Sequence, residues 1–305
     1  MEDRRGVGEA VRLLRGKGVP FNTDVSLKNH TTMRVGGEVP LWIEPRNEEE
    51  TAFALRVLAE AFGSAKPLVL GRGSNLLPCD RGLSRGVVFT GGMSGIERLD
   101  GGRVRVTGGT TFSQVLSFCV SEGLSGLEPL SGIPATVGGM VVMNAGSFGR
   151  SIGELIESIR LIKFSGEGRV FGVSEVDWGY RFSSLKGKGV VTQVVLRLAD
   201  AKRGSVRAEV ARFMRQRAEK QPLGMPSSGS VFKNPPGFSA GRLIEDAGLK
   251  GRRMGGAQVS EKHANFIVNR GEARCRDVLG LMELVKREVS ERFGVTLEEE
   301  VEYVC

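Results

Sequence analysis

The chain has 305 residues, 40% hydrophobic and 26% charged, and its 43 Lys and Arg exceed its 35 Asp and Glu to give a formal net charge of +8. This composition is typical of a globular protein, and a chain of this length usually forms more than one hydrophobic core. No apolar run approaches the roughly 18 residues that span a bilayer. The charged N-terminus does not resemble a secretory signal, so we expect a cytoplasmic protein.

The cysteines and histidines argue against a metal centre and against a disulfide framework. Cys79, Cys119, Cys275 and Cys305 are far apart and form no C-x-x-C motif, and the chain has only 2 His. Structural zinc sites and disulfide-rich domains use closer or patterned spacing. We therefore expect no metal site and the reducing environment of the cytoplasm.

The positive charge favours anionic partners, which include nucleic acid, anionic lipid and phosphorylated small molecules, without choosing among them. Aromatic residues make up 6% of the chain and are not interleaved with basic patches, so a base-stacking surface for nucleic acid is poorly supported. A basic surface that serves only solubility is the alternative.

Hydrophobic periodicity, caps and turn residues predict a mixture of helices and strands. In chain order we expect a short helix around Val11 and Leu14, a helix from Glu48 to Gly63, a strand at 67–70, a hairpin around 100–106, a helix from about Thr111 to Gly123, strands at 159–164 and 190–196, a linker at 200–204, a helix carrying Val206 to Met214, a long helix that ends at Gly294 and a strand at 300–304. Hairpins beside crossovers indicate an α+β fold with two or three subdomains.

The most unusual feature is the glycine content, 44 residues that gather in clusters. Gly71-Arg72-Gly73-Ser74-Asn75 follows the strand predicted at 67–70, where glycine would let backbone amides approach a phosphate. The loop is not a Rossmann fingerprint, because Leu76 stands where the third glycine belongs and Pro78 follows where a helix should run. A strand-to-strand turn without a ligand is the alternative.

A second cluster, rich in small residues, covers 131–140 and continues into Asn144-Ala145-Gly146. Small side chains over such a length leave room for a large ligand to lie against the backbone. A glycine-rich bend between strands is the alternative. Two clusters of similar composition favour a dinucleotide ligand.

Six stretches carry a resemblance to a known family: residues 30–37, 71–77, 132–146, 180–181, 229–235 and 297–301. In this order they resemble the UDP-N-acetylenolpyruvoylglucosamine reductases, flavoenzymes that make UDP-N-acetylmuramate for peptidoglycan. The resemblance runs from about residue 21 to the C-terminus. It implies non-covalent FAD, NADPH as co-substrate and a UDP-sugar substrate, with neither nucleic acid nor a membrane span. The oligomeric state is not fixed, and a monomer is expected.

The fold that the resemblance implies is α+β. Residues 1–63 and 64–199 would form the two subdomains of an FAD-binding unit of the vanillyl-alcohol-oxidase-like type, and 200–305 an α+β substrate-binding domain. The residues assigned to FAD are Arg34, Gly71, Arg72, Gly73, Ser74, Asn75, Leu76, Gly132, Ile133, Pro134, Ala135, Thr136, Gly138, Gly139, Asn144, Ala145 and Gly146.

The resemblance also assigns three catalytic residues. Ser230 would donate a proton to C2 of the enolpyruvyl group after hydride reaches C3, Arg181 would stabilise the developing enolate, and Glu300 would act on the carboxylate side. From the residues alone, Ser230 reads as a turn serine and Arg181 as a surface arginine. Glu300 likewise reads as part of a solvated run of three glutamates.

For the substrate, the resemblance points to Tyr180, Lys220, Lys233 and Asn234, although Lys220 reads equally as a cation that caps a helix C-terminus. No tyrosine lies between Tyr180 and Tyr303, so the chain resembles the shorter class without a tyrosine-bearing loop. Two alternative functions are a flavin oxidase of the same fold and a basic nucleic-acid-binding protein. A flavin absorption band would exclude the second of these.

Overall fold

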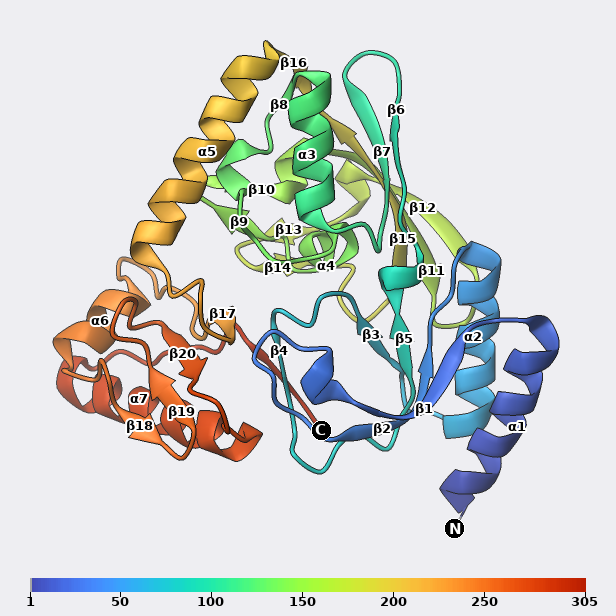
Figure 1. Cartoon of the computed structure of the whole chain (residues 1–305), viewed down its shortest axis with the longest axis horizontal. Coiled ribbons are helices and arrows are strands. Elements are labelled where there is room, and N and C mark those ends of the chain that lie inside the picture. Colours follow the sequence, from blue (N-terminus) through green and yellow to red (C-terminus); the bar gives the residue numbers. More distant parts are fainter. Residues whose placement is uncertain (1) are drawn as a thin grey trace. The chain divides into compact units, whose positions relative to one another are not determined.

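The computed structural model describes residues 2–305 (Figure 1). These residues form two compact units. The first unit comprises the residues up to Val25, 40–72 and 84–215, and the second comprises 26–39, 73–83 and 216–305. The boundary therefore crosses the loop at 71–75, and it crosses helix α5 after Arg215. The three-part division at residues 63 and 199 stays a prediction.

The helices are α1 (Glu2–Lys17), α2 (Glu48–Phe62), α3 (Phe112–Glu122), α4 (Val137–Val142), α5 (Arg203–Lys220), α6 (Ala240–Asp246) and α7 (Cys275–Phe293). Short 3-10 turns are η1 (Leu27–Asn29), η2 (Thr90–Gly92), η3 (Glu128–Leu130), η4 (Ile152–Leu155) and η5 (Val173–Glu175).

The strands are β1 (Phe21–Ser26), β2 (Glu38–Ile43), β3 (Leu68–Leu70), β4 (Leu76–Pro78), β5 (Val87–Phe89), β6 (Ile96–Arg98), β7 (Arg103–Thr107), β8 (Leu124–Ser125), β9 (Gly146–Ser147), β10 (Arg150–Ser151), β11 (Ile156–Lys163), β12 (Gly168–Gly172), β13 (Trp178–Gly179), β14 (Phe182–Ser183), β15 (Gly189–Arg197), β16 (Ala199–Asp200), β17 (Ser227–Ser230), β18 (Arg253–Met254), β19 (Ala257–Val259), β20 (Phe266–Asn269) and β21 (Glu302–Val304).

The first unit is built on two sheets. Five antiparallel strands run in the order β12-β11-β15-β7-β6, and a smaller sheet has the order β1-β2-β5-β3. Helices α3 and α4 contribute Phe112, Val115 and Met140 to the core that includes Val104 and Val194 of the large sheet. A separate core joins α1 and α2 to the small sheet.

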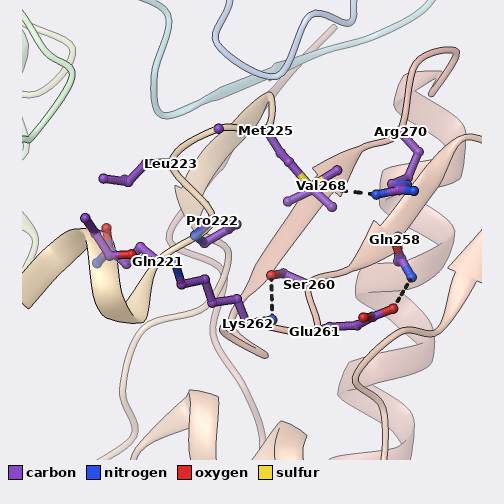
Figure 2. A pocket seen from close by; sticks show the side chains of 12 residues that line it. Gln221, Pro222, Leu223, Met225, Gln258, Ser260, Glu261, Lys262, Val268 and Arg270 are labelled. Atoms are coloured by element: carbon purple, nitrogen blue, oxygen red, sulfur yellow. Dashed lines mark hydrogen bonds between the residues drawn. The ribbon is translucent and has the colours of Figure 1, made fainter.

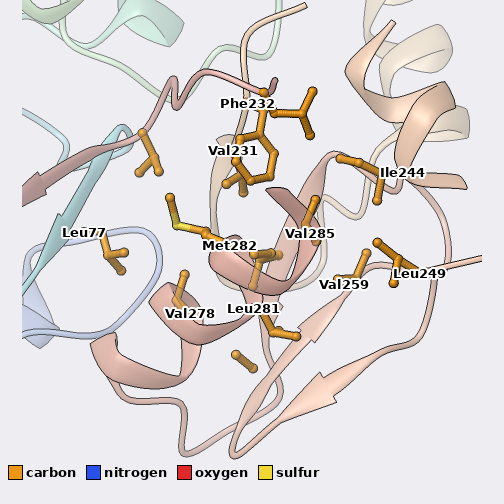
Figure 3. Packing of buried hydrophobic residues seen from close by; sticks show 14 of the residues in the cluster. Leu77, Val231, Phe232, Ile244, Leu249, Val259, Val278, Leu281, Met282 and Val285 are labelled. Atoms are coloured by element: carbon orange, nitrogen blue, oxygen red, sulfur yellow. The ribbon is translucent and has the colours of Figure 1, made fainter. Parts of the chain in front are cut away.

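The second unit packs α6 and α7 against the sheet β17-β20-β19-β18. In Figure 3, Val278, Leu281, Met282 and Val285 of α7 point into one cluster with Val259 of β19. This spacing is the i, i+3, i+4, i+7 stripe of an amphipathic helix, which explains why the sequence pattern predicts α7 well.

Several predicted helix ends are confirmed by their caps. Asn47 accepts a hydrogen bond from the Glu50 amide at the start of α2. Thr111 and Gln114 form a capping box at the start of α3, and Gly123 ends that helix in the left-handed conformation with φ +69°. Gly294 ends α7 in the same way, with φ +65°.

The predicted linker at 200–204 is wrong. Asp200 lies in β16, which pairs with β8, and α5 begins at Arg203. Two contacts order this polar segment: Asp200 forms an ion pair with Arg98 at 2.9 Å, and the Ala201 amide donates to Gly123 O at 2.7 Å. The final strand also begins later than predicted, at Glu302.

The cysteines form no disulfide framework, but one pair is bonded although nothing in the sequence spacing indicates it. Cys79 and Cys305 are bonded, with Cα atoms 5.1 Å apart. The reason is topological: β4 and β21 pair in parallel with Val304 opposite Pro78, so the residues that follow each strand meet. Cys119 and Cys275 remain free thiols and are buried.

Candidate functional site

In the first unit the two glycine clusters predicted from the sequence lie together. A Cβ on Gly71 would come within 2.2 Å of Thr136 Oγ1, so only glycine allows the two segments this approach. Thr136 is buried, and its hydroxyl accepts a hydrogen bond from the Gly139 amide at 3.3 Å at the start of α4. The strand that leads into the 71–75 loop is β3, as predicted.

Part of the second cluster is helical. Val137 to Val142 are helical, and the Gly138 amide donates to Gly108 O at 2.8 Å. Ile133 and Ala135 pack against the core of the first unit. Gly132, with φ +82°, supplies the turn before this segment.

Beyond α4, the chain reaches the hairpin that carries Arg181. Tyr180 and Arg181 form the two-residue turn between β13 and β14, and Arg181 has φ +57°. Its guanidinium lies over the Tyr180 ring, 5.0 Å from the centroid. A Cβ on Gly146 would lie 3.3 Å from Arg181 Nη1, so the arginine also lies close to the glycine-rich backbone.

In the second unit, the remainder of the 71–75 loop packs against the turn that contains Arg34. Gly73 has φ +60°, and a Cβ there would come within 2.4 Å of His30 O. The Thr32 amide donates to Gly73 O at 3.2 Å. Arg34 itself is exposed and has φ +58°. The predicted cofactor residues Arg34 and Gly73 thus share one small region of this unit.

The same unit brings Ser230 and Glu300 together. Ser230 ends β17 opposite Phe266 of β20, and the Glu300 amide donates to the carbonyl of the next residue, Val231, at 2.8 Å. The side-chain amide of Asn75 donates to Glu300 O at 3.0 Å. One backbone hydrogen bond and one bond from the Asn75 side chain therefore hold the segments of Ser230, Glu300 and Asn75 together.

Asn265, which lies in none of the sequence motifs, also supports this arrangement. Its side chain donates to Phe232 O at 2.8 Å and accepts from the Phe232 amide at 3.0 Å, and it is 4% exposed. Buried polar side chains of this kind are normally retained because both ends are satisfied. The only signal in the sequence is that Asn265 directly precedes the apolar residues 266–268 of β20.

The predicted substrate residues have mixed environments. Lys233 is half-buried and its ammonium is paired with Glu298, while Asn234 accepts a hydrogen bond from the Ala240 amide at 3.0 Å. Lys220 is the exposed last residue of α5, and Tyr180 is 54% exposed. Lys220, Lys233 and Asn234 belong to the second unit, and Tyr180 to the first.

A pocket of about 460 Å³ opens in the second unit directly after Lys220 (Figure 2). Gln258 and Glu261 interact at one side of it, where Gln258 Nε2 donates to Glu261 Oε1 at 3.3 Å. The Lys262 ammonium donates to Ala218 O at 2.5 Å. The lining is Ala218, Gln221, Pro222, Leu223, Gly224, Met225, Gln258, Ser260, Glu261, Lys262, Val268 and Arg270.

Burial shifts three titratable groups outside these clusters. It lowers the pKa of His263, with a further contribution from the charge of Lys250. It raises the pKa values of the Cys119 and Cys275 thiols to about 12, so both stay protonated and unreactive at neutral pH. Within residues 2–305, no three His, Cys, Asp or Glu gather as metal ligands, and no helix is both long and apolar enough to cross a bilayer.

In each unit, taken by itself, the glycine-rich backbone suits a dinucleotide such as FAD. At Gly71 and Gly73 the backbone makes approaches that any side chain would block. Gly132 adds a further turn with positive φ. Backbone of this kind is what dinucleotide phosphates need, because it exposes amide groups without side chains in front of them.

Comparison with known proteins identifies both parts of the chain. Residues 39–172 match the FAD binding domain, and residues 221–304 match the UDP-N-acetylenolpyruvoylglucosamine reductase C-terminal domain. The UDP-N-acetylenolpyruvoylglucosamine reductase of Moorella thermoacetica is 41% identical over 92% of each chain. Reductase 2 of Symbiobacterium thermophilum is 44% identical over 90% of this chain and 89% of its own.

A crystal structure of the reductase from Thermus caldophilus superimposes with a TM-score of 0.80 at 38% identity, covering 94% of this chain and 99% of that one. The α+β fold with an FAD-binding unit and the FAD and NADPH dependence are thereby confirmed. The chain belongs to the UDP-N-acetylenolpyruvoylglucosamine reductase family, FAD-containing oxidoreductases that use NADPH to reduce UDP-N-acetylglucosamine enolpyruvate to UDP-N-acetylmuramate for peptidoglycan synthesis.

Proposed function

We propose that Ser230, Glu300 and Arg181 carry this reaction in the present chain. The observation that supports the proposal most directly is the hydrogen bond from the Glu300 amide to Val231 O, beside Ser230, together with the Asn75 amide on Glu300 O. An acidic residue and a hydroxyl donor far apart in sequence are thus fixed next to each other and to the predicted phosphate loop.

The chemistry requires these residue types. FAD, when bound, supplies the hydride that reduces the enolpyruvyl double bond. Reduction builds negative charge on the substrate carboxylate, and the Arg181 guanidinium suits that charge because it is planar and permanently cationic. Ser230 Oγ then donates a proton to C2, which a weakly acidic hydroxyl can do because the enolate is strongly basic. Glu300, beside a carboxylate, would have to be protonated or bridged.

The remaining assignments follow the same proposal. Tyr180, Lys220, Lys233 and Asn234 bind the UDP-sugar. The FAD pyrophosphate lies against the backbone of 71–75 and 132–139, and the cofactor is held without a covalent bond. The enzyme acts as a cytoplasmic monomer of the shorter class, and its chain is divided at residues 63 and 199.

The run of three glutamates offers a matched test of Glu300. Glu300→Gln should lower turnover, measured as NADPH oxidation dependent on UDP-N-acetylglucosamine enolpyruvate, by about 100-fold or more, the usual scale for a catalytic acid or base. Glu299→Gln, whose carboxylate pairs with Lys286 at 3.1 Å, should leave turnover unchanged. Normal turnover by Glu300→Gln, or equal losses in both variants, would remove Glu300 from the mechanism.

A further inference from the structure

Hydrogen bonds from two buried side chains connect the hairpin that carries Arg181 to the C-terminal end of helix α4. Asn144 Nδ2 donates to Gly179 O at 2.8 Å, on the strand that enters the turn. Ser183 Oγ donates to Val142 O at 2.8 Å, on the strand that leaves it. Asn144 is 7% exposed and Ser183 0% exposed, so neither bond competes with bulk water.

Both polar ends of the Asn144 side chain are engaged. Besides the bond to Gly179, its Oδ1 accepts from the Gly153 amide at 3.1 Å in η4. A Cβ on Gly153 would come within 2.9 Å of Asn144 Oδ1 and 2.8 Å of the Trp178 ring, so a glycine is needed for this three-way contact. The amide therefore ties α4, η4 and the hairpin together.

Local backbone conformation adds a second reason why the hairpin needs support. Arg181 has φ +57° and Asn144 φ +43°, both in the left-handed region. Asparagine tolerates this region comparatively well, whereas arginine adopts it only when the surroundings enforce it. Asn144 and Ser183 hold the two sides of the Tyr180-Arg181 turn.

We infer that Asn144 is a positioning residue that acts through Arg181 rather than a side-chain ligand of FAD, an inference that rests on the proposed role of Arg181. The other end of α4 begins at Thr136, which lies against Gly71 of the predicted phosphate loop. Helix α4 thus connects the cofactor loop to the catalytic hairpin, and the Asn144 amide fixes the guanidinium relative to both.

The test uses the FAD-loaded enzyme and separates its two half-reactions by rapid mixing. Asn144→Asp keeps the shape of the side chain and the acceptor for Gly153, but it places a carboxylate oxygen against Gly179 O. Flavin reduction by NADPH and the FAD content should stay at the wild-type level. Reoxidation by UDP-N-acetylglucosamine enolpyruvate should slow by about 100-fold, the cost of misplacing a catalytic group by about 1 Å.

A double-mutant comparison with Arg181→Ala distinguishes a positioning role of Asn144 from a merely structural one. In an Arg181→Ala background, Asn144→Asp should cause little further loss of the reoxidation rate, because the group it positions is gone. Losses that multiply, or a parallel fall in flavin reduction or FAD content, would overturn the inference. If Arg181→Ala alone reoxidises at the wild-type rate, the proposed role of Arg181 falls as well, which distinguishes the two failures.

Two further variants guard against misfolding. Ser183→Ala removes the other fastening and should slow the same half-reaction, to a smaller extent; an unchanged rate in both Ser183→Ala and Asn144→Asp would overturn the inference. Asn47→Ala removes the N-cap of α2 in the same unit. It should lower the melting temperature while leaving both half-reactions unchanged.

Discussion

The disulfide between Cys79 and Cys305 should make a large contribution to stability. It joins residues separated by 226 positions in a chain of 305 residues, so it closes a long loop. In the chain-entropy model such a loop is worth roughly 5 kcal/mol, and native disulfides contribute about 2–5 kcal/mol in practice. We expect about 3 kcal/mol, because hydrogen bonds from Glu300 and Glu302 would still hold the C-terminal segment after the bond is broken.

The assay is urea unfolding of the FAD-loaded enzyme with and without a phosphine reductant, beside the variant Cys305→Ser. Cys305 is exposed, so serine there disturbs no packing. Reductant should destabilise the wild-type enzyme to the level of Cys305→Ser and should not affect the variant. Thiol titration of the unfolded, unreduced wild type should find two thiols, those of Cys119 and Cys275. Four thiols would show that Cys79 and Cys305 are not bonded. Wild-type stability that is insensitive to reductant would show that the bond contributes nothing to stability.

Three further predictions concern single positions. Gly71→Ala should destabilise the first unit by about 1–3 kcal/mol and reduce FAD content, because its Cβ would meet Thr136 Oγ1 at 2.2 Å; an unchanged melting curve and FAD content would contradict this. Asn265→Ala should cost about 2–6 kcal/mol in the free energy of unfolding, since it leaves the buried Phe232 amide and carbonyl unpaired, and chemical denaturation measures it. Burial lowers the pKa of His263, so the unfolded chain takes up its proton first and stability should fall as pH drops below about 6.5; His263→Gln should flatten that fall in pH-dependent melting.

Local signals predicted much of the fold. The caps of α2 and α3 and the apolar stripe of α7 depend on residues close together in the sequence. Short-range patterns therefore predict where these helices lie. The segment at 200–204 was mistaken for a linker because its order comes from Arg98 and Gly123, which no local pattern reveals. The disulfide cannot be predicted from the sequence for the same reason. It depends on the parallel pairing of β4 with β21, two strands that are far apart in the chain.

The candidate site shows the same division. The glycine clusters indicate where two backbone segments approach each other closely. Gly71 of the first cluster does lie against Thr136 of the second. Family motifs picked out Ser230 and Glu300, but only the structure shows that Val231 connects them. Asn144 was assigned to the cofactor from its motif, whereas its side-chain partners are the backbone of Gly179 and Gly153.

The proposed role of Ser230 as proton donor can be measured through the half-reactions of Ser230→Ala, with Ser227→Ala on the same strand as the control. We predict that NADPH reduces the flavin of both variants at the wild-type rate. Reoxidation by UDP-N-acetylglucosamine enolpyruvate should be abolished in Ser230→Ala and retained in Ser227→Ala. Reoxidation of Ser230→Ala at the wild-type rate would show that Ser230 is not the proton donor.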